Sequence, residues 1–181
     1  MRYRRLQVPG GTFFFTVVTW QRRPLLNAPA VRTRLGQALR AVRQYRPFHL
    51  DAIVLLPDHL HCLWTLPPAD SEYALRWRLI KRHMAMRCGI GPVWQPRYWE
   101  HLIRDEADFR HHVEYIHFNP VRHGYVAAPA DWPWSSFERH VREGIYPGDW
   151  GRSAPELPEV VGRELVGCSW QPTSRAGRYP T

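Results

Sequence analysis

The chain has 181 residues, enough to bury the core of one domain, and it carries a formal net charge of +9 with a pI near 10.1. Of its 25 basic residues only Lys81 is a lysine, and residues 1–46 hold ten arginines without any aspartate or glutamate. This composition indicates a polyanionic partner, nucleic acid before a membrane surface, although nucleotide bias in the source genome would also raise the arginine content.

The N-terminal third of the sequence predicts a strand followed by a helix. Residues 12–20 are rich in aromatic and β-branched side chains and follow a pair of glycines, which is typical of a strand. Asn27 is the expected N-cap of the helix, and Pro29 lies in its first turn. Apolar residues then recur at helical spacing until Pro47, which should end the helix.

Residues 48–56 and 58–66 are two apolar runs separated by a Pro-Asp turn, a pattern that predicts an antiparallel hairpin. Side chains alternate along a strand, so His59 and His61 should lie on the same face of the second strand. Two imidazoles held on a rigid strand suit a divalent metal ion. The ordinary alternative is a pair of partly buried polar residues on a sheet.

Two further helices and one strand are expected in the second half. Residues 71–87 should form a helix with five basic side chains and one acidic side chain, a sign bias that favours contact with phosphate over simple solvation. A short strand is expected over residues 98–104. Asp105 should cap a third helix that runs to about Phe118, because Pro120 forces its end.

Strand, helix, strand, strand, helix, strand is the element order of a ferredoxin-like α+β sandwich, an antiparallel sheet with helices on one face. In this chain a further helix follows the last strand. We expect residues 1–140 to form this domain. Residues 141–181 should form a C-terminal extension rich in Gly, Pro and Arg that is partly disordered, with one short helix near residues 155–166.

On a helical wheel the expected third helix separates into two faces. Phe109, Val113 and Ile116 make an apolar face. The stripe on the other side is polar and consists of Asp108, His111, His112, Tyr115 and Asn119. A tyrosine on a helix is usually an amphipathic residue at the edge of the core, but this placement would direct its hydroxyl toward the imidazoles of the hairpin.

The spacing of the cysteines indicates the redox state of the compartment in which the protein works. Cys62, Cys88 and Cys168 are far apart and form no C-x-x-C pair, which argues against a disulfide framework and favours a reducing cytoplasm. No apolar stretch approaches the roughly 18 residues of a transmembrane helix. Arginines precede residues 12–20 as in a signal peptide, but no small-residue cleavage site follows. We therefore expect a cytoplasmic, nucleoid-associated bacterial protein with no membrane partner.

Two motifs in this order carry a resemblance to a known family. Pro-Asp-His-Leu-His at residues 57–61, followed by Tyr-Ile-His-Phe-Asn-Pro-Val-Arg at residues 115–122, resembles the single-tyrosine HUH transposases, where U is a hydrophobic residue. The sequence is most similar to the REP-associated tyrosine transposases, which are linked to repetitive extragenic palindromes. The similarity covers about residues 3–140, including the Trp-Gln and Tyr-Trp pairs within residues 94–99.

The resemblance implies a Mg²⁺ or Mn²⁺ ion held by His59 and His61, with Tyr115 as the nucleophile. Asn119 stands where related transposases place a third metal ligand, often a glutamine. Attack by the tyrosine would leave a 5′-phosphotyrosine and a free 3′-hydroxyl. The implied partner is single-stranded or hairpin DNA, bound by a monomer or a homodimer. The basic residues that we expect to contact the DNA are Arg22, Arg23, Arg78, Lys81, Arg82 and Arg122.

Other functions fit parts of the sequence. A histidine-triad hydrolase alternates three histidines, but Leu63 occupies the third position, and a two-histidine phosphoesterase needs a second H-x-[ST] strand that the sequence lacks. A non-catalytic nucleic-acid-binding module would stack bases on exposed aromatic residues of the same sheet. Its candidates are Phe13, Phe14 and Phe15. A covalent adduct with single-stranded DNA would distinguish the enzyme from such a module.

Overall fold

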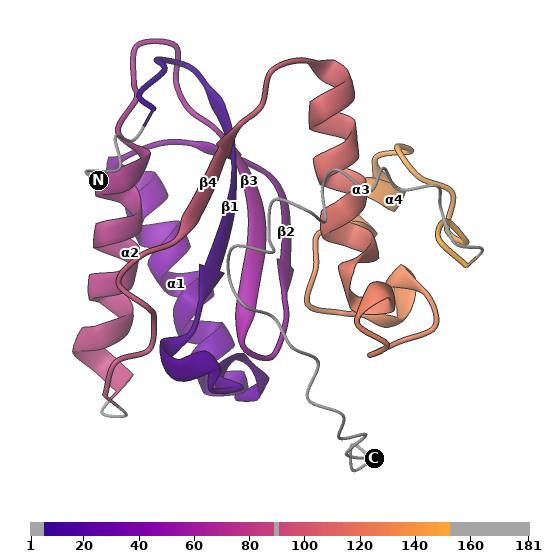
Figure 1. Ribbon diagram of the computed structural model, residues 1–181, viewed down its shortest axis with the longest axis horizontal. Helices are drawn as coiled ribbons and strands as arrows, with labels where there is room; N and C mark the ends of the chain where they lie inside the picture. Colours follow the sequence, from indigo (N-terminus) through magenta and orange to yellow (C-terminus); the bar gives the residue numbers. More distant parts are fainter. Residues whose placement is uncertain (1–5, 89–90, 153–181) are drawn as a thin grey trace.

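The centre of the computed structural model, which describes residues 6–88 and 91–152, is a four-stranded antiparallel sheet (Figure 1). The strands are β1 (Thr12–Val18), β2 (His49–Leu55), β3 (His59–Thr65) and β4 (Trp99–Leu102). Their order in the sheet is β2-β3-β1-β4, so the two central strands are β3 and β1. The predicted hairpin is therefore confirmed, and its second strand lies inside the sheet.

Four helices and three short 3-10 turns complete the described chain. The helices are α1 (Pro29–Tyr45), α2 (Tyr73–Cys88), α3 (Glu106–Arg122) and α4 (Phe137–Arg142), and the turns are η1 (Trp20–Arg22), η2 (Leu25–Asn27) and η3 (Pro129–Asp131). The order β1-α1-β2-β3-α2-β4 confirms the expected ferredoxin-like α+β sandwich. Among the helices of the described residues, none is long and apolar enough to cross a bilayer.

Helices cover both faces of the sheet (Figure 1). As expected, α1 and α2 share one face, where they pack on Phe13, Phe15 and Trp64. The additional helix α3 lies on the other face and packs on Phe14 and Leu63. Since neighbouring residues of a strand point to opposite faces, β1 and β3 contribute to two separate cores. A sheet with helices on one face therefore describes only the part of the fold from β1 to β4, and α3 adds a second helical layer.

The beginning of α1 differs from the expectation by one residue. Pro29 is the first helical residue, so the N-cap is Ala28, which makes no side-chain cap hydrogen bond. Asn27 instead ends the turn η2. Proline at the first helical position removes one of the N–H groups that the start of a helix leaves unpaired, and its fixed φ suits the helix. The N–H of Val31 bonds to the backbone carbonyl of Ala28 at 3.0 Å.

Helix α3 begins as expected and ends later than expected. Asp105 caps it, because the carboxylate of Asp105 accepts a hydrogen bond from the backbone N–H of Asp108 at 2.8 Å. Pro120 lies inside the helix, which continues to Arg122. A proline fits helical φ and removes only one backbone hydrogen bond, and the N–H of His123 still bonds to the carbonyl of Asn119 at 3.0 Å. The extra turn carries Arg122 on the same stripe as Tyr115.

The segment after α3 protects the edge of the sheet. The N–H of Leu55 bonds to the carbonyl of Trp134, and the N–H of Ser136 bonds to the carbonyl of Ile53, each at 2.8 Å. These bonds satisfy backbone groups that an edge strand would otherwise expose. Tyr146 and Trp150 then pack with the core under α3. The short helix predicted near residues 155–166 lies outside the described residues.

Candidate active site between the sheet and α3

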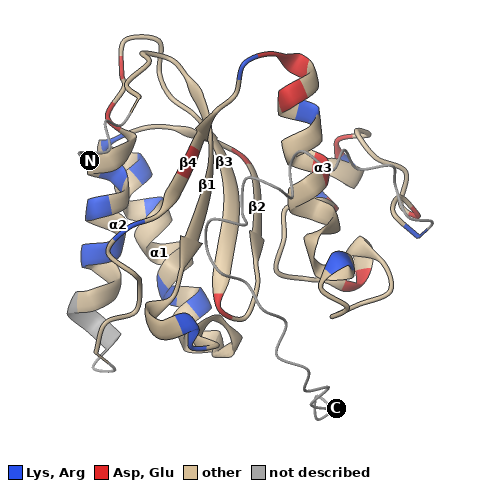
Figure 2. Cartoon of the chain, in the orientation of Figure 1, with Lys and Arg blue, Asp and Glu red and all other residues tan. Residues whose placement is uncertain are grey.

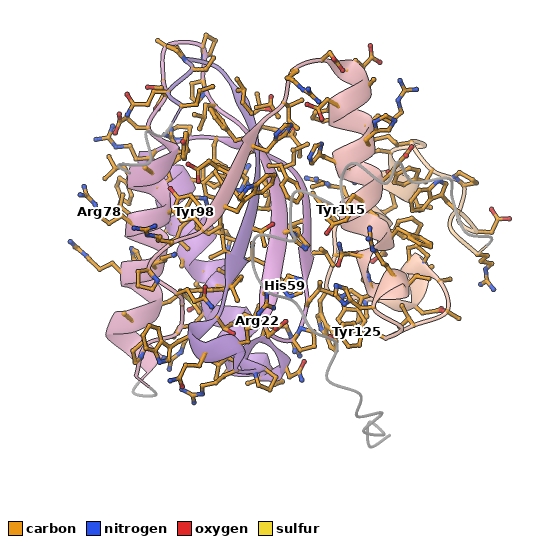
Figure 3. The ribbon with its side chains drawn as sticks, viewed as in Figure 1. Arg22, His59, Arg78, Tyr98, Tyr115 and Tyr125 are labelled. Atoms are coloured by element: carbon orange, nitrogen blue, oxygen red, sulfur yellow. The ribbon has the colours of Figure 1, made fainter. Side chains whose placement is uncertain are left out.

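The two histidines and the tyrosine of the predicted site meet between β3 and α3. Figure 3 shows His59 on the sheet and Tyr115 on the facing side of α3. The ring centroids of His59 and His61 are 4.9 Å apart, and those of His61 and Tyr115 are 5.3 Å apart. All three side chains are buried. The structure thus joins three residues that are up to 56 positions apart in the sequence.

Oxygen atoms behind the two imidazoles fix their orientation. The Nδ1–H of His59 donates to the carboxylate of Asp58 at 2.6 Å, and Nδ1 of His61 is hydrogen-bonded to the hydroxyl of Thr16 at 2.9 Å. Each ring therefore has Nε2 as the nitrogen that it can offer to a metal ion. Such hydrogen bonds typically orient metal-binding histidines and select their tautomer.

Asp58 is held as a carboxylate by its neighbours. Burial alone would raise the pKa of Asp58, but the hydrogen bonds and positive charges of His59 and Arg22 outweigh it and lower the pKa to about 2. The guanidinium of Arg22 donates to the second carboxylate oxygen at 2.9 Å. This arrangement depends on tertiary structure, so sequence analysis missed it. An aspartate directly before the first histidine was its one visible signal.

A strained turn brings Arg22 to Asp58. Gln21 and Arg22 both have left-handed backbone conformations, with φ of 54° and 52°. Each such residue costs on the order of 1 kcal/mol, and strained residues of this kind cluster at functional sites. The turn is held by the hydroxyl of Thr19, whose single proton is shared between the carbonyls of Arg23 at 2.7 Å and Asp58 at 2.9 Å.

Asn119 is buried at the same site with an unsatisfied amide. Its side chain is 1% exposed, and neither amide atom has a hydrogen bond of ordinary geometry within the described residues, although the amide lies close enough to the hydroxyl of Tyr115 to lower the pKa of that phenol. A buried polar group left in this state costs about 1–3 kcal/mol. Two imidazole nitrogens and one amide oxygen form a donor set that fits a divalent cation, and Mn²⁺ accepts such nitrogen donors more readily than Mg²⁺.

The phenol of Tyr115 is protonated in the isolated protein. Burial raises its pKa above the usual value near 10, while the nearby amide of Asn119 and the guanidinium of Arg122 oppose this rise. The guanidinium carbon of Arg122 lies 5.8 Å from the centroid of the tyrosine ring. A positive charge beside the phenol favours the anion that forms when the hydroxyl loses its proton.

Contrary to the helical wheel, the polar stripe of α3 does not avoid the core. His112, Tyr115 and Asn119 are buried against the sheet together with Val113 and Ile116, whereas Phe109 is only partly buried. His111 also is only partly buried. Both faces of helix α3 are covered, because the sheet packs on one side of it and the segment around α4 packs on another.

The six basic residues expected at DNA fall into two groups. Arg22 and Arg122 lie at the site, and Arg23 is exposed in the adjoining turn. The others lie on α2, which covers the opposite face of the sheet; they are Arg78, Lys81 and Arg82. Figure 2 shows the basic residues along α2, and Figure 3 places Arg78 far from Tyr115.

Two basic residues of α2 serve the fold. Arg76 is fully buried, and its guanidinium forms a two-point ion pair with the carboxylate of Asp70 at 2.9 and 2.7 Å. The ammonium of Lys81 donates to the backbone carbonyls of Gln95 at 2.6 Å and Pro96 at 3.3 Å. The expectation that the whole basic run of this helix faces phosphate is therefore wrong for Arg76.

A second cluster of potential metal ligands lies beside the site. Within the described residues, His101, Asp108 and His112 are the one group of three or more His, Cys, Asp or Glu side chains whose ligand atoms converge, all within 4.8 Å of one another. The sequence placed Asp108 and His112 on one stripe but missed His101. The alternation of the short strand β4 was the available signal, because it puts His101 on the face that α3 covers.

The aromatic residues of β1 are not available to stack on bases. Phe13, Phe14 and Phe15 are at most 1% exposed, because helices cover both faces of the sheet. A sheet-surface binding module of the kind considered from the sequence requires exposed aromatic rings. This alternative loses its structural basis.

Comparison with known proteins gives the family. No model of a protein family matches the sequence. The chain is 49% identical over 148 residues to the REP-associated tyrosine transposase of Escherichia coli K12, and the match covers 82% of this chain and 89% of that protein. This chain belongs to the REP-associated tyrosine transposases. The resemblance seen in the sequence is confirmed, and as a transposase of this family the protein is an enzyme.

Two further comparisons agree. A Haemophilus influenzae protein described by the same family name is 40% identical over 169 residues, covering 86% of this transposase and 95% of the relative. A solved structure of a REP-associated tyrosine transposase bound to a REP hairpin has a TM-score of 0.78 and 45% identity. It covers 88% of this transposase and 97% of the solved chain. The fold is therefore shared over nearly the whole solved chain.

Proposed function

We propose that this transposase cleaves and rejoins single-stranded DNA at hairpin-forming repetitive elements through a covalent bond to Tyr115. The observation that carries the proposal is the contact of Tyr115 with His61, whose ring centroids are 5.3 Å apart, in a buried site that also contains His59 and Asn119. The related transposase solved with a REP hairpin supports the choice of hairpin DNA as the partner.

Tyr115 is the proposed nucleophile. The hydroxyl of Tyr115 gives its proton to water, and its oxygen attacks the scissile phosphorus. The bond from phosphorus to the 3′-oxygen breaks, the 3′-oxygen takes up a proton from water, and the product is a 5′-phosphotyrosine with a free 3′-hydroxyl. Rejoining is the reverse attack by a 3′-hydroxyl. Arg122 stabilises the negative charge that develops on the tyrosine oxygen as its proton leaves. Because each chain supplies one such tyrosine, strand transfer in a monomer reuses Tyr115, and in a homodimer it can use the second copy.

Nε2 of His59, Nε2 of His61 and the amide oxygen of Asn119 are the proposed ligands of Mg²⁺ or Mn²⁺. When bound, the ion polarises the scissile phosphate and offsets its charge. The protein's own contribution is orientation, since Asp58 and Thr16 hold the two rings by hydrogen bonds of 2.6 and 2.9 Å. The unsatisfied amide of Asn119 would gain a partner on metal binding, which favours its role as the third ligand.

The basic residues are proposed to bind two parts of the DNA. Arg22, Arg23 and Arg122 would contact phosphates near the scissile bond. Arg78 and Arg82 would contact phosphates along α2, and Lys81, whose ammonium binds the carbonyls of Gln95 and Pro96, would add its positive charge beside them. All the proposed site residues lie within residues 1–140, the proposed catalytic domain. Residues 141–181 are proposed to be its C-terminal extension, the first part of which packs on the domain through Tyr146 and Trp150.

The test uses the full chain, Mn²⁺ and a single-stranded oligonucleotide that carries a REP hairpin with its flanking sequence. A 5′-phosphotyrosine leaves the protein on the 3′ fragment, so a 3′ label should shift with the protein in a denaturing gel and a 5′ label should not. Tyr115→Phe should give no adduct. Tyr125→Phe is the matched control, because Tyr125 stacks on His123 near the site, with centroids 5.7 Å apart. An adduct formed by Tyr115→Phe would contradict the proposal.

A further inference from the structure

The cluster beside the proposed active site has the composition of a metal centre. His101 extends from β4, while Asp108 and His112 lie one turn apart near the start of α3. Nε2 of His101 is 3.0 Å from one carboxylate oxygen of Asp108, and Nδ1 of His112 is 3.1 Å from the other. The two imidazoles stack with centroids 4.9 Å apart at an interplanar angle of 16°.

The burial, charge and hydrogen bonds of the three side chains suit metal binding. Asp108 and His112 are buried, and the side chain of His101 is 16% exposed. Burial would raise the pKa of Asp108, but hydrogen bonds from His101 and Arg104 outweigh it and lower the pKa to about 2, so Asp108 is a carboxylate at neutral pH. The Nδ1–H of His112 donates to the backbone carbonyl of Asp108 at 2.8 Å, which leaves the lone pair on Nε2.

We propose that His101, Asp108 and His112 form a second cation site, for a borderline transition-metal ion such as Zn²⁺. Two imidazoles and one carboxylate are a common donor set for zinc and for neighbouring first-row metals. The third donor of the proposed active site is the amide oxygen of Asn119, whereas the third donor of this cluster is the carboxylate of Asp108, which is the stronger ligand for Zn²⁺. The second site should therefore bind Zn²⁺ more tightly than the first.

Arg104 occupies part of the cluster and can leave it. Its guanidinium donates to Asp108 at 3.2 Å, but its side chain is 69% exposed. A bound ion would take over the role of this positive charge, and the guanidinium would move into solvent. The backbone N–H of Arg104, which donates to the same carboxylate oxygen at 3.1 Å, would remain as a support for the ligand.

The ring of Phe14 packs between the cluster and the proposed active site. Phe14 contacts His112, His61 and Tyr115, with centroid distances of 4.8, 5.4 and 5.9 Å. An ion at the cluster would fasten the first turns of α3 to β4, two elements that Figure 1 shows joined by a loop. Its role is then to position the helix that carries Tyr115.

The experiment measures zinc stoichiometry by equilibrium dialysis of the full chain with Zn²⁺ alone. The double variant His59→Ala/His61→Ala removes the proposed active-site ligands and should bind one equivalent. Adding His101→Gln should abolish that equivalent, and adding His111→Gln should not. His101 lies on an edge strand and His111 is only partly buried, so both substitutions should leave the fold intact. Co²⁺ in place of Zn²⁺ should show no thiolate charge-transfer absorption, which excludes the cysteines.

Melting temperature supplies a second readout. Zn²⁺ should raise the melting temperature of the double variant but not that of the variant with the added His101→Gln. If the double variant neither binds zinc nor is stabilised by it, or if His101→Gln keeps the zinc, the inference is overturned. If the wild type binds one equivalent that depends on His101 alone, the inference stands and the metal role of His59 and His61 fails.

Discussion

The two faces of the central sheet are built from the same strands but bury different chemistry. The face under α1 and α2 buries aromatic and aliphatic side chains. Within the described residues its two buried charged side chains are paired, Arg76 with Asp70 and Glu100 with the hydroxyl of Tyr73. Among the described residues, every buried histidine lies on the side of α3. These histidines are His59, His61, His112, His117 and His140.

The difference indicates a division of labour within one sheet. Burying a large apolar side chain stabilises a fold by about 1.5–3 kcal/mol, whereas a buried polar group costs free energy unless it is hydrogen-bonded. The apolar face can therefore offset the cost of unsatisfied groups such as Asn119 on the other face. Substitutions on the α3 face should therefore impair chemistry, and those on the α1/α2 face should impair stability.

The largest expected effect separates neighbouring residues of β3. Replacing His59 or His61 with alanine should lower the metal-dependent cleavage rate about a thousandfold. This factor corresponds to the several kcal/mol of transition-state stabilisation that a catalytic metal ion supplies. Cys62 lies between these positions in the sequence and on the other face, so Cys62→Ala should keep the rate and cost about 1 kcal/mol of stability. Rates are compared at a temperature where all variants are folded. Cleavage by a histidine variant at the wild-type rate in EDTA would refute the metal role.

Phe14 and Phe15 provide the same comparison on β1. Phe14 contacts His61 and Tyr115, whereas Phe15 contacts Trp64 on the other face. Both Phe→Leu changes should cost about 1–2 kcal/mol of stability. Only Phe14→Leu should also lower the cleavage rate, by about a hundredfold, because small displacements of reacting groups are costly. Equal cleavage rates for the two folded variants would remove the distinction between the faces.

The arginines extend the comparison to DNA. With six phosphate contacts the wild type should show a slope of about −4 to −5 in log K against log salt, at 0.7–0.9 per contact. Arg82→Ala, on α2, should make the slope shallower by one contact and leave cleavage at saturating DNA unchanged. Arg122→Ala should lower that cleavage rate about tenfold, since its guanidinium lies beside Tyr115. A wild-type slope shallower than about −2 would mean that the charge serves solubility.

The buried histidines predict sensitivity to acid. Burial lowers the pKa values of His117 and His140 below the usual 6.5. A lowered histidine pKa contributes stability above pH 6.5 that is lost as the pH falls, by up to about 1.4 kcal/mol per pH unit for each group. His140→Gln should weaken this dependence of the unfolding free energy, and His49→Gln, at an exposed position, should not. An unchanged dependence in His140→Gln would contradict the assignment.

The smallest effect concerns Asn119. If its amide is unsatisfied without metal, Asn119→Leu should raise the stability of the metal-free protein by about 1 kcal/mol and weaken Mn²⁺ binding. Asn119→Asp should retain or strengthen Mn²⁺ binding, because aspartate keeps the ligand oxygen and adds a charge. Unchanged Mn²⁺ affinity in both variants would remove Asn119 from the site.

The features that could be read from the sequence are those fixed by neighbouring residues. Alternation along the hairpin places His59 and His61 on one face, and the capping aspartate marks the start of α3 at Asp105. The resemblance to a transposase family added Tyr115, which spacing alone would not have distinguished from an ordinary helical tyrosine.

The features that the sequence did not reveal depend on packing between distant segments. No local pattern in the sequence indicates that α3 covers the second face of the sheet. This placement buries the polar stripe of α3. Pro120 stays helical although the local rule predicts an end. Arg76 looks like a surface cation, but Asp70 holds it inside. His101 lies on the four-residue strand β4, and only the tertiary fold brings it to Asp108 and His112 of α3.

Locating the DNA adduct within the protein tests the central claim most directly. The full chain is incubated with Mn²⁺ and the hairpin oligonucleotide, the covalent complex is digested with protease and nuclease, and the modified peptide is sequenced by mass spectrometry. We expect a nucleotide attached through its 5′-phosphate to Tyr115, and no modified peptide when EDTA is present. Attachment at Tyr125 or any other residue, or cleaved DNA without a modified peptide, would contradict it.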